Sequence, residues 1–279
     1  MRRALFILAL LATWPCAFAQ EPVDLVRKSV ELEVTAAQDY SSPYTYVLRK
    51  ESNSGVAVRQ MVETKDGLLL ARTITWNGKV PSAEDQAKED KRLERLITSA
   101  DERSKKAAEQ KDDAQRALRI LRALPTSSLY TMDGREMIAG RDTIRLAFKP
   151  NPKFGPEAKE TYLLKAAEGK MWIDAESNRM VRLDATITDS VNIGWGLLGK
   201  IDKGGKLFLE QALVKGGQWR MTQLRIDATG KALIFKSIRI KQHQSGSNYE
   251  PIKPVTVAEG VAMLKRAAQT TSASITEQR

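Results

Sequence analysis

The strongest constraint on this chain is a long succession of short segments that alternate polar and apolar residues and are separated by turns. About eleven such segments are rich in β-branched and aromatic residues, which is typical of strands. They span 44–51, 56–64, 68–76, 129–137, 143–149, 161–164, 170–174, 180–188, 206–214, 218–227 and 232–241. Short connections rich in Gly, Asn, Asp and Ser predict antiparallel neighbours in one large sheet, with Gly169 and Gly230 among the expected turn residues. A sheet that wide has to curl to bury one face.

Two parts of the sequence have a helical pattern instead. Apolar residues recur at three-to-four spacing over 24–40, directly after Pro22. Residues 82–124 contain no Gly or Pro and open with Ser82-Ala-Glu-Asp85, which resembles a capping box, so they predict a helical insertion. The insertion carries two apolar stripes, Leu93, Leu96, Ile97 and Ala100, and then Ala114, Ala117, Leu118 and Leu121. One bent helix and two helices both fit this pattern, and Pro125 should end the segment.

The strand pattern is lost from Gln244 onward, where a short helix over 257–268 and a flexible tail over 270–279 are expected. The predicted fold class is therefore α+β. We expect a large curved antiparallel sheet that forms an incomplete barrel of about eleven strands, with helices packed on its concave face.

The N-terminus has the three parts of an export signal. Arg2 and Arg3 are followed by an apolar stretch over 4–12 and by Ala17-Phe18-Ala19, a small-x-small cleavage site. We expect residues 1–19 to be removed, which leaves one domain over 20–269 that starts at Gln20. Cys16 follows Pro15 and is not expected to carry a lipid. No later apolar run is long enough to span a bilayer, so we expect a soluble protein that is periplasmic or otherwise exported.

The composition leaves little material for catalysis. One His and one Cys in 279 residues make a zinc site, a Ser-His-Asp site or a Cys-His site poor candidates. A hydrophobic content of 42% is enough for a sizeable core. The formal net charge of +11 fits either solubility or attraction to acidic membrane surfaces, whereas nucleic acid is not an expected partner of an exported chain. We expect no enzyme activity, no metal and no cofactor, and a monomer.

The Gly-rich run over 194–199 and the single histidine, His243, could each suggest a binding site, but both have simpler interpretations. Residues 194–199 match G-x-G-x-x-G, but the following residues are poor helix formers, so a dinucleotide site is not expected. The loop could instead present Trp195, Leu197 and Leu198 to a membrane or a cargo, or fold them back onto the core. His243 has no neighbouring ligands at a metal spacing and is interpreted as a surface residue.

The strand sequences resemble those of the outer-membrane lipoprotein-sorting (LolA/LolB-like) superfamily. The resemblance is carried by the run from Gly134 to Pro150, by Gly169-Lys-Met-Trp-Ile-Asp174 and by Met180-Val-Arg-Leu-Asp184. It covers most of residues 21–243, and this chain departs from the family in its longer charged helical region and its Gly-rich loop after Ile193. The resemblance implies a curved, incomplete barrel closed by helices around an apolar cavity that holds acyl chains, with no catalytic residues.

On that interpretation, large apolar residues of the strands form the cavity wall; otherwise they fill an ordinary core. The candidates are Ile74, Trp76, Leu146, Phe148, Ile173, Val181, Leu183, Leu209, Met221 and Ile234. The expected function is that of an exported carrier that binds lipid or lipoprotein acyl chains in the cell envelope. The alternative is a periplasmic sensor or adaptor that binds a protein partner through an open sheet edge or through the charged helices.

Overall fold

A computed structural model of the chain describes residues 21–193, 199–232 and 236–276. The expected export signal over 1–19 and the expected first mature residue, Gln20, lie outside the described residues. So do Trp195, Leu197 and Leu198 of the candidate loop and the candidate wall residue Ile234.

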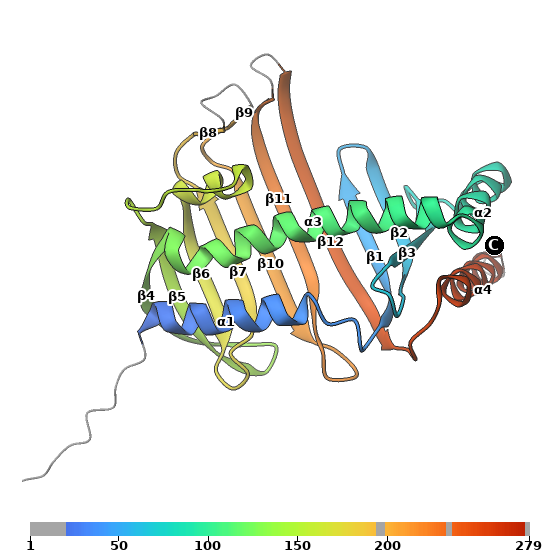
Figure 1. Cartoon of the computed structure of the whole chain (residues 1–279), viewed down its shortest axis with the longest axis horizontal. Coiled ribbons are helices and arrows are strands. Elements are labelled where there is room, and N and C mark those ends of the chain that lie inside the picture. The colour runs from blue at the N-terminus through green and yellow to red at the C-terminus, as the bar shows by residue number, and fades with distance from the viewer. Residues whose placement is uncertain (1–20, 194–198, 233–235, 277–279) are drawn as a thin grey trace, which may run out of the picture.

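Twelve strands form one antiparallel sheet (Figure 1). The strands are β1 (Tyr44–Ser52), β2 (Gly55–Glu63), β3 (Leu69–Trp76), β4 (Ser128–Ile138), β5 (Arg141–Pro150), β6 (Ala167–Asp174), β7 (Met180–Ile187), β8 (Val191–Ile193), β9 (Gly199–Ile201), β10 (Lys206–Leu213), β11 (Trp219–Ala232) and β12 (Lys236–Pro251). Their order is β3-β2-β1-β12-β11-β10-β7-β6-β5-β4, and the short β8–β9 pair joins β11 at the side. Because β3 and β4 do not pair with each other, the sheet stays open, which confirms the predicted α+β incomplete barrel.

The helices are α1 (Pro22–Ala36), α2 (Ala83–Thr98), α3 (Ala100–Ser127), a 3-10 helix η1 (Lys159–Lys165) and α4 (Val257–Thr276). The insertion is two helices, because Ser99 is extended and its side chain accepts a hydrogen bond from the Glu102 N–H at 3.2 Å, which starts α3 anew. Ser82 caps α2 in the same way, through the Asp85 N–H at 3.1 Å.

Pro125 does not end the insertion, as the sequence predicted, but lies inside the last turn of α3. A proline removes one backbone donor, and near the end of a helix the carbonyls left free can find partners elsewhere. Here the Tyr130 hydroxyl donates to the Leu124 carbonyl at 2.8 Å, and the Asn151 side chain donates to the Thr126 carbonyl at 2.9 Å.

Four other local predictions were wrong. Residues 161–164 belong to η1 rather than to a strand, and β12 runs to Pro251 because it pairs with β1 and β11 along its length. The last helix continues to Thr276, into the expected loose tail. Gly169 and Gly230 lie within strands rather than at turns. A Cβ on Gly169 would lie 1.9 Å from the Asp184 carbonyl oxygen, and one on Gly230 would lie 2.2 Å from that of Lys200, so each glycine permits a close backbone approach.

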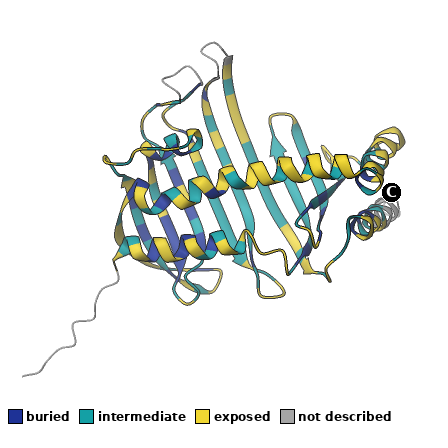
Figure 2. Cartoon of the chain, in the orientation of Figure 1, coloured by how far each residue is buried: buried dark blue, intermediate teal, exposed yellow. Residues whose placement is uncertain are grey.

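The helices divide the hydrophobic core into separate clusters. Helix α1 and the C-terminal half of α3 cover one face of the sheet, here called the helix-covered face, and bury side chains of β5, β6 and β7 (Figures 1 and 2). A second cluster lies at the other end of the sheet, between α2, α4 and strands β2 and β3. A third, smaller cluster contains Ile138, Trp172, Val181 and Trp219.

Candidate functional site

The structure brings together half of the candidate wall residues, and it packs them as a filled core. Leu146 and Ile173 are completely buried and Phe148 and Leu183 nearly so, in one cluster with α1, α3 and η1. Leu209 packs against the margin of this cluster and stays half-buried. Under the C-terminal half of α3, helix side chains therefore already occupy the helix-covered face.

The other described candidates lie elsewhere. Val181 is buried in the third cluster with Trp172 and Trp219, because a register shift between Trp172 and Ile173 turns it away from Leu183. Met221 is half-buried beside a register shift on β11, opposite Gln211. Ile74 and Trp76 lie on the outermost strand β3, far along the sheet order from Leu183.

The middle of α3 has exposed residues on the same face as its packed ends. The helix contacts α1, α2, η1 and β4. Its C-terminal residues Leu121 and Leu124 pack in the first cluster, and Gln110 bonds β3. Between these ends, Ala114 is one turn from both Gln110 and Leu118, so it shares their face of the helix. Gln110 reaches the sheet and Leu118 is buried, yet Ala114 and Ala117 are exposed. This exposed part of α3 lies where the helix crosses the middle strands of the sheet (Figure 1).

The strand residues on the same face in this region are half-buried rather than buried. Strand pairing places Leu209, Leu224, Gln244 and Lys50 in one row that continues from Leu183 of the core. We call the half-buried residues of this face the mid-sheet strip: Leu48, Lys50, Arg59, Leu209, Leu224, Ile226 and Gln244. The strip is apolar on β10 and β11 and polar or basic on β12, β1 and β2. Figure 2 shows these middle strands as intermediate in burial, between the buried strands and the second cluster.

A cluster of tyrosines borders the strip, and the sequence pattern did not single it out. Tyr46 has the same orientation as Leu48, two residues along β1, and stacks on Tyr249 with ring centroids 4.8 Å apart. Arg220 lies 4.5 Å above the ring of Tyr44 and donates to Glu63 at 3.3 Å. Burial raises the pKa of the Glu63 carboxyl above its usual value, against the charge of Arg220. The only sequence signal for this cluster was the aromatic content of β1.

The outer edge of β3 is closed by helix side chains. The Gln110 side chain bonds both backbone groups of Leu69, Arg92 donates to the Ala71 carbonyl at 2.7 Å, and the Thr73 N–H bonds the Glu89 carboxylate. These contacts take the place of a neighbouring strand.

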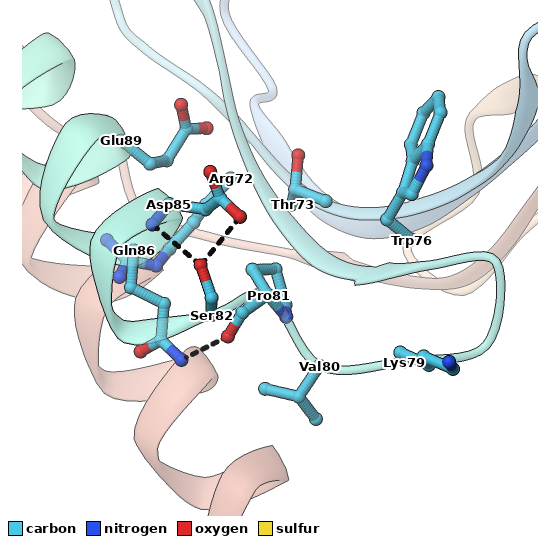
Figure 3. Close-up of a pocket in the computed structure, with 10 residues that line it drawn as sticks. All are labelled: Arg72, Thr73, Trp76, Lys79, Val80, Pro81, Ser82, Asp85, Gln86 and Glu89. Carbon is cyan, nitrogen blue, oxygen red and sulfur yellow. Dashed lines mark hydrogen bonds between the residues drawn. The ribbon is translucent and has the colours of Figure 1, made fainter.

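A pocket of about 500 Å³ lies between β3, the following loop and the start of α2 (Figure 3). Its lining includes Trp76, which is 42% exposed, together with Thr73, Pro81 and Gln86. Its charged walls are mostly satisfied internally, since Arg72 pairs with Asp90 and Glu89 with Arg92. The lining thus combines the apolar side chains of Trp76, Val80 and Pro81 with polar and charged ones.

The opposite edge of the sheet is open. Strand β4 pairs with β5 only, and it exposes Leu129, Met132 and Met137 by 44%, 56% and 64%. A bulge at Gly134, with φ of +101°, interrupts the strand in its middle.

Within residues 21–193, 199–232 and 236–276, no group of three or more His, Cys, Asp or Glu residues could hold a metal ion. His243 is half-buried on β12, opposite Arg225 and Glu51. In that same part of the chain, no helix combines the length and hydropathy needed to cross a membrane.

No family model and no curated protein matches the sequence. Similar solved structures include a DUF1329 family protein from Desulfovibrio piger, with 16% identity over 85% of this chain and 96% of that one, at a TM-score of 0.33. An outer membrane lipoprotein-sorting protein domain from Vibrio parahaemolyticus has 10% identity over 83% and 95%, at 0.32. A LolA superfamily protein from Nitrosomonas europaea has 9% identity over 87% and 98%, at 0.27.

Proposed function

We propose that the protein is an exported carrier that binds an acyl chain of a lipid or lipoprotein between the middle of α3 and the mid-sheet strip. One observation carries this proposal: Ala114 and Ala117 face the sheet but are exposed, above strand leucines that are only half-buried. An apolar chain placed there would remove both surfaces from water, and each buried methylene contributes about 0.8 kcal/mol.

The site is distinct from the filled core. Leu146 and Ile173 leave no surface for a ligand, whereas Leu209, Leu224 and Ile226 do. The role is sequestration rather than catalysis, because apolar and amide groups dominate this face of β10, β11 and β12. The basic side chains elsewhere on the chain would favour approach to acidic membrane surfaces.

Probe binding to the purified mature protein tests the proposal. A neutral fluorescent fatty alcohol should bind the wild type, and native mass spectrometry should detect co-purified lipid. Ala114→Trp and Leu224→Trp should each reduce uptake by filling the space from opposite sides. Ala108→Trp is the matched control, since Ala108 is exposed two residues from Gln110 and so points away from the sheet. Absence of uptake in the wild type, or an equal loss in the control, would refute the carrier.

The alternative function, an adaptor for a protein partner, is favoured by the open strand β4. An extended segment could add to this edge and cover Leu129 and Met132. Pull-down with the purified chain, compared with a Met132→Pro variant that removes a β4 N–H facing the open edge, tests it. A partner retained equally by both proteins would exclude β4 as the docking edge.

A further inference from the structure

The mid-sheet strip contains two basic side chains that have no acidic partner. Lys50 on β1 is paired with Ala57 on β2, and Arg59 is paired with Leu48. Lys50 and Arg59 are therefore diagonal neighbours on one face, about 7 Å apart on the backbone. Both are half-buried, and no carboxylate of the described residues lies within ion-pair distance of either.

Arg59 is an exception among the arginines of the sheet. Six other arginines in described strands are buried or half-buried, and each is paired with an acid: Arg49, Arg72, Arg141, Arg145, Arg182 and Arg220. Lys50 differs in the same way from Lys200, a half-buried lysine of β9, which lies 3.8 Å from Asp202. Two neighbouring cations that lack an acidic partner on a half-buried face can bind an anion that the chain itself does not supply.

The surroundings of the pair indicate which anion fits. Leu48 lies between the two cations on the same face, and Gln244 opposite Lys50 offers an amide donor. The row then continues into Leu224 and Leu209. A free inorganic anion would leave these leucines uncovered, whereas a molecule with an anionic head and a long apolar tail would match both halves of the strip.

We propose that the ligand is an acyl lipid with an anionic head, a carboxylate or a phosphate, held by Lys50 and Arg59. Its chain runs under Ala114 along Leu224 and Leu209. This inference rests on the proposed carrier function and adds the class of ligand and the direction in which it lies.

Two fluorescent probes with the same chain separate the head from the tail: a long-chain fatty acid and the corresponding fatty alcohol. The wild type should bind the acid about tenfold more tightly, the usual effect of a charge-assisted hydrogen bond. Lys50→Gln and Arg59→Gln should each remove most of this preference and leave alcohol binding unchanged. Lys241→Gln, on the other face of β12, changes the charge equally and should preserve it.

The outcomes are distinguishable. Equal binding of both probes by the wild type, or an equal effect of Lys241→Gln, overturns the assignment of the head while the carrier function stands. Binding of neither probe overturns the carrier function and this inference with it.

Competition with inorganic phosphate tests the head site separately. Displacement of the acid but not the alcohol by millimolar phosphate supports the pair as the head site. Tight phosphate binding without probe binding indicates a simple anion site and overturns the assignment of a lipid ligand. If Arg59→Gln does not fold, Arg59→Lys should fold and retain the preference for the acid.

Discussion

The side chain of Gln110 on α3 hydrogen-bonds both backbone groups of Leu69 on β3. The Leu69 N–H donates to Oε1 at 3.0 Å, and Nε2 donates to the Leu69 carbonyl at 2.8 Å. One amide side chain thus satisfies the pair of groups that an additional strand would occupy. The contact also fixes the N-terminal half of α3 to the far edge of the sheet, while the core fixes its C-terminal half. The exposed middle of the helix is held between these two attachments.

Gln110→Ala should therefore weaken the attachment of α3 and expose the edge of β3. The loss of two hydrogen bonds to partly buried groups should lower the free energy of unfolding by about 1–3 kcal/mol. Hydrogen exchange at the Leu69 amide should accelerate, and urea unfolding gives the energy. Lys111→Ala, at an exposed neighbouring position, is the control. If the Leu69 amide exchanges as slowly in the Gln110 variant as in the wild type, the Gln110–Leu69 hydrogen bonds do not protect this edge.

The filled core and the mid-sheet strip should respond differently to truncation. Leu146→Ala removes a completely buried side chain and should cost about 2–5 kcal/mol of stability. Leu224→Ala removes a half-buried one, so it should cost less than Leu146→Ala but should lower uptake of a fatty alcohol. Chemical denaturation and probe titration on the same preparations check both effects. Equal destabilisation by the two substitutions would indicate that the strip is core.

Glu33 on α1 is the anchor of a largely buried ion pair. Its carboxylate accepts hydrogen bonds from Arg179 Nε at 2.8 Å, from Arg179 Nη2 at 2.9 Å and from the Met180 N–H at 3.1 Å. Arg179→Met leaves the carboxylate without its counter-charge and should cost about 3–5 kcal/mol. The double variant with Glu33→Met should recover part of this loss, as measured by urea unfolding in a double-mutant cycle. Additive losses would mean that the two side chains are not coupled.

Asp174 should contribute to acid sensitivity. Burial alone would raise the pKa of this carboxyl, but hydrogen bonds from Arg141 and Ser177 outweigh it and hold the pKa well below its usual range. The folded pKa is below the unfolded value near 4, so the stabilisation is complete above that value and is lost as the pH falls below it. Unfolding at pH 7, 5 and 3 should show a smaller acid loss for Asp174→Asn than for wild type. Parallel curves would contradict the assignment.

The open edge strand β4 should make the protein prone to self-association. Met132→Lys places a charge on an exposed position and should reduce concentration-dependent association, with a change in stability within about 0.5 kcal/mol. Sedimentation velocity over a range of concentrations measures the association. Unchanged association would direct attention to another surface.

The sequence by itself determined the local elements and the fold class. Ser82 caps α2, period-two alternation places the strands, and their short turns make them antiparallel neighbours, because these effects act between residues a few positions apart. The same local information led to the misinterpretation of Gly169 and Gly230 as turn residues. Glycine is required at both positions because the backbone of a neighbouring strand approaches closely there. The alternation of polar and apolar residues does not show that approach.

Only the tertiary structure decided which faces are filled and which remain open. The pairing of β1 with β12 joins segments almost two hundred residues apart and places Lys50 opposite Gln244. A register shift turns Val181 away from Leu183, and Ala114 stays exposed between the two attached parts of α3. The burial and the charge pairing of the candidate site residues depend on contacts with residues that are distant in the sequence. The physical reason is the range of the interactions. Burial and charge pairing depend on residues far apart in the sequence, whereas caps, turns and periodicity depend on residues a few positions apart.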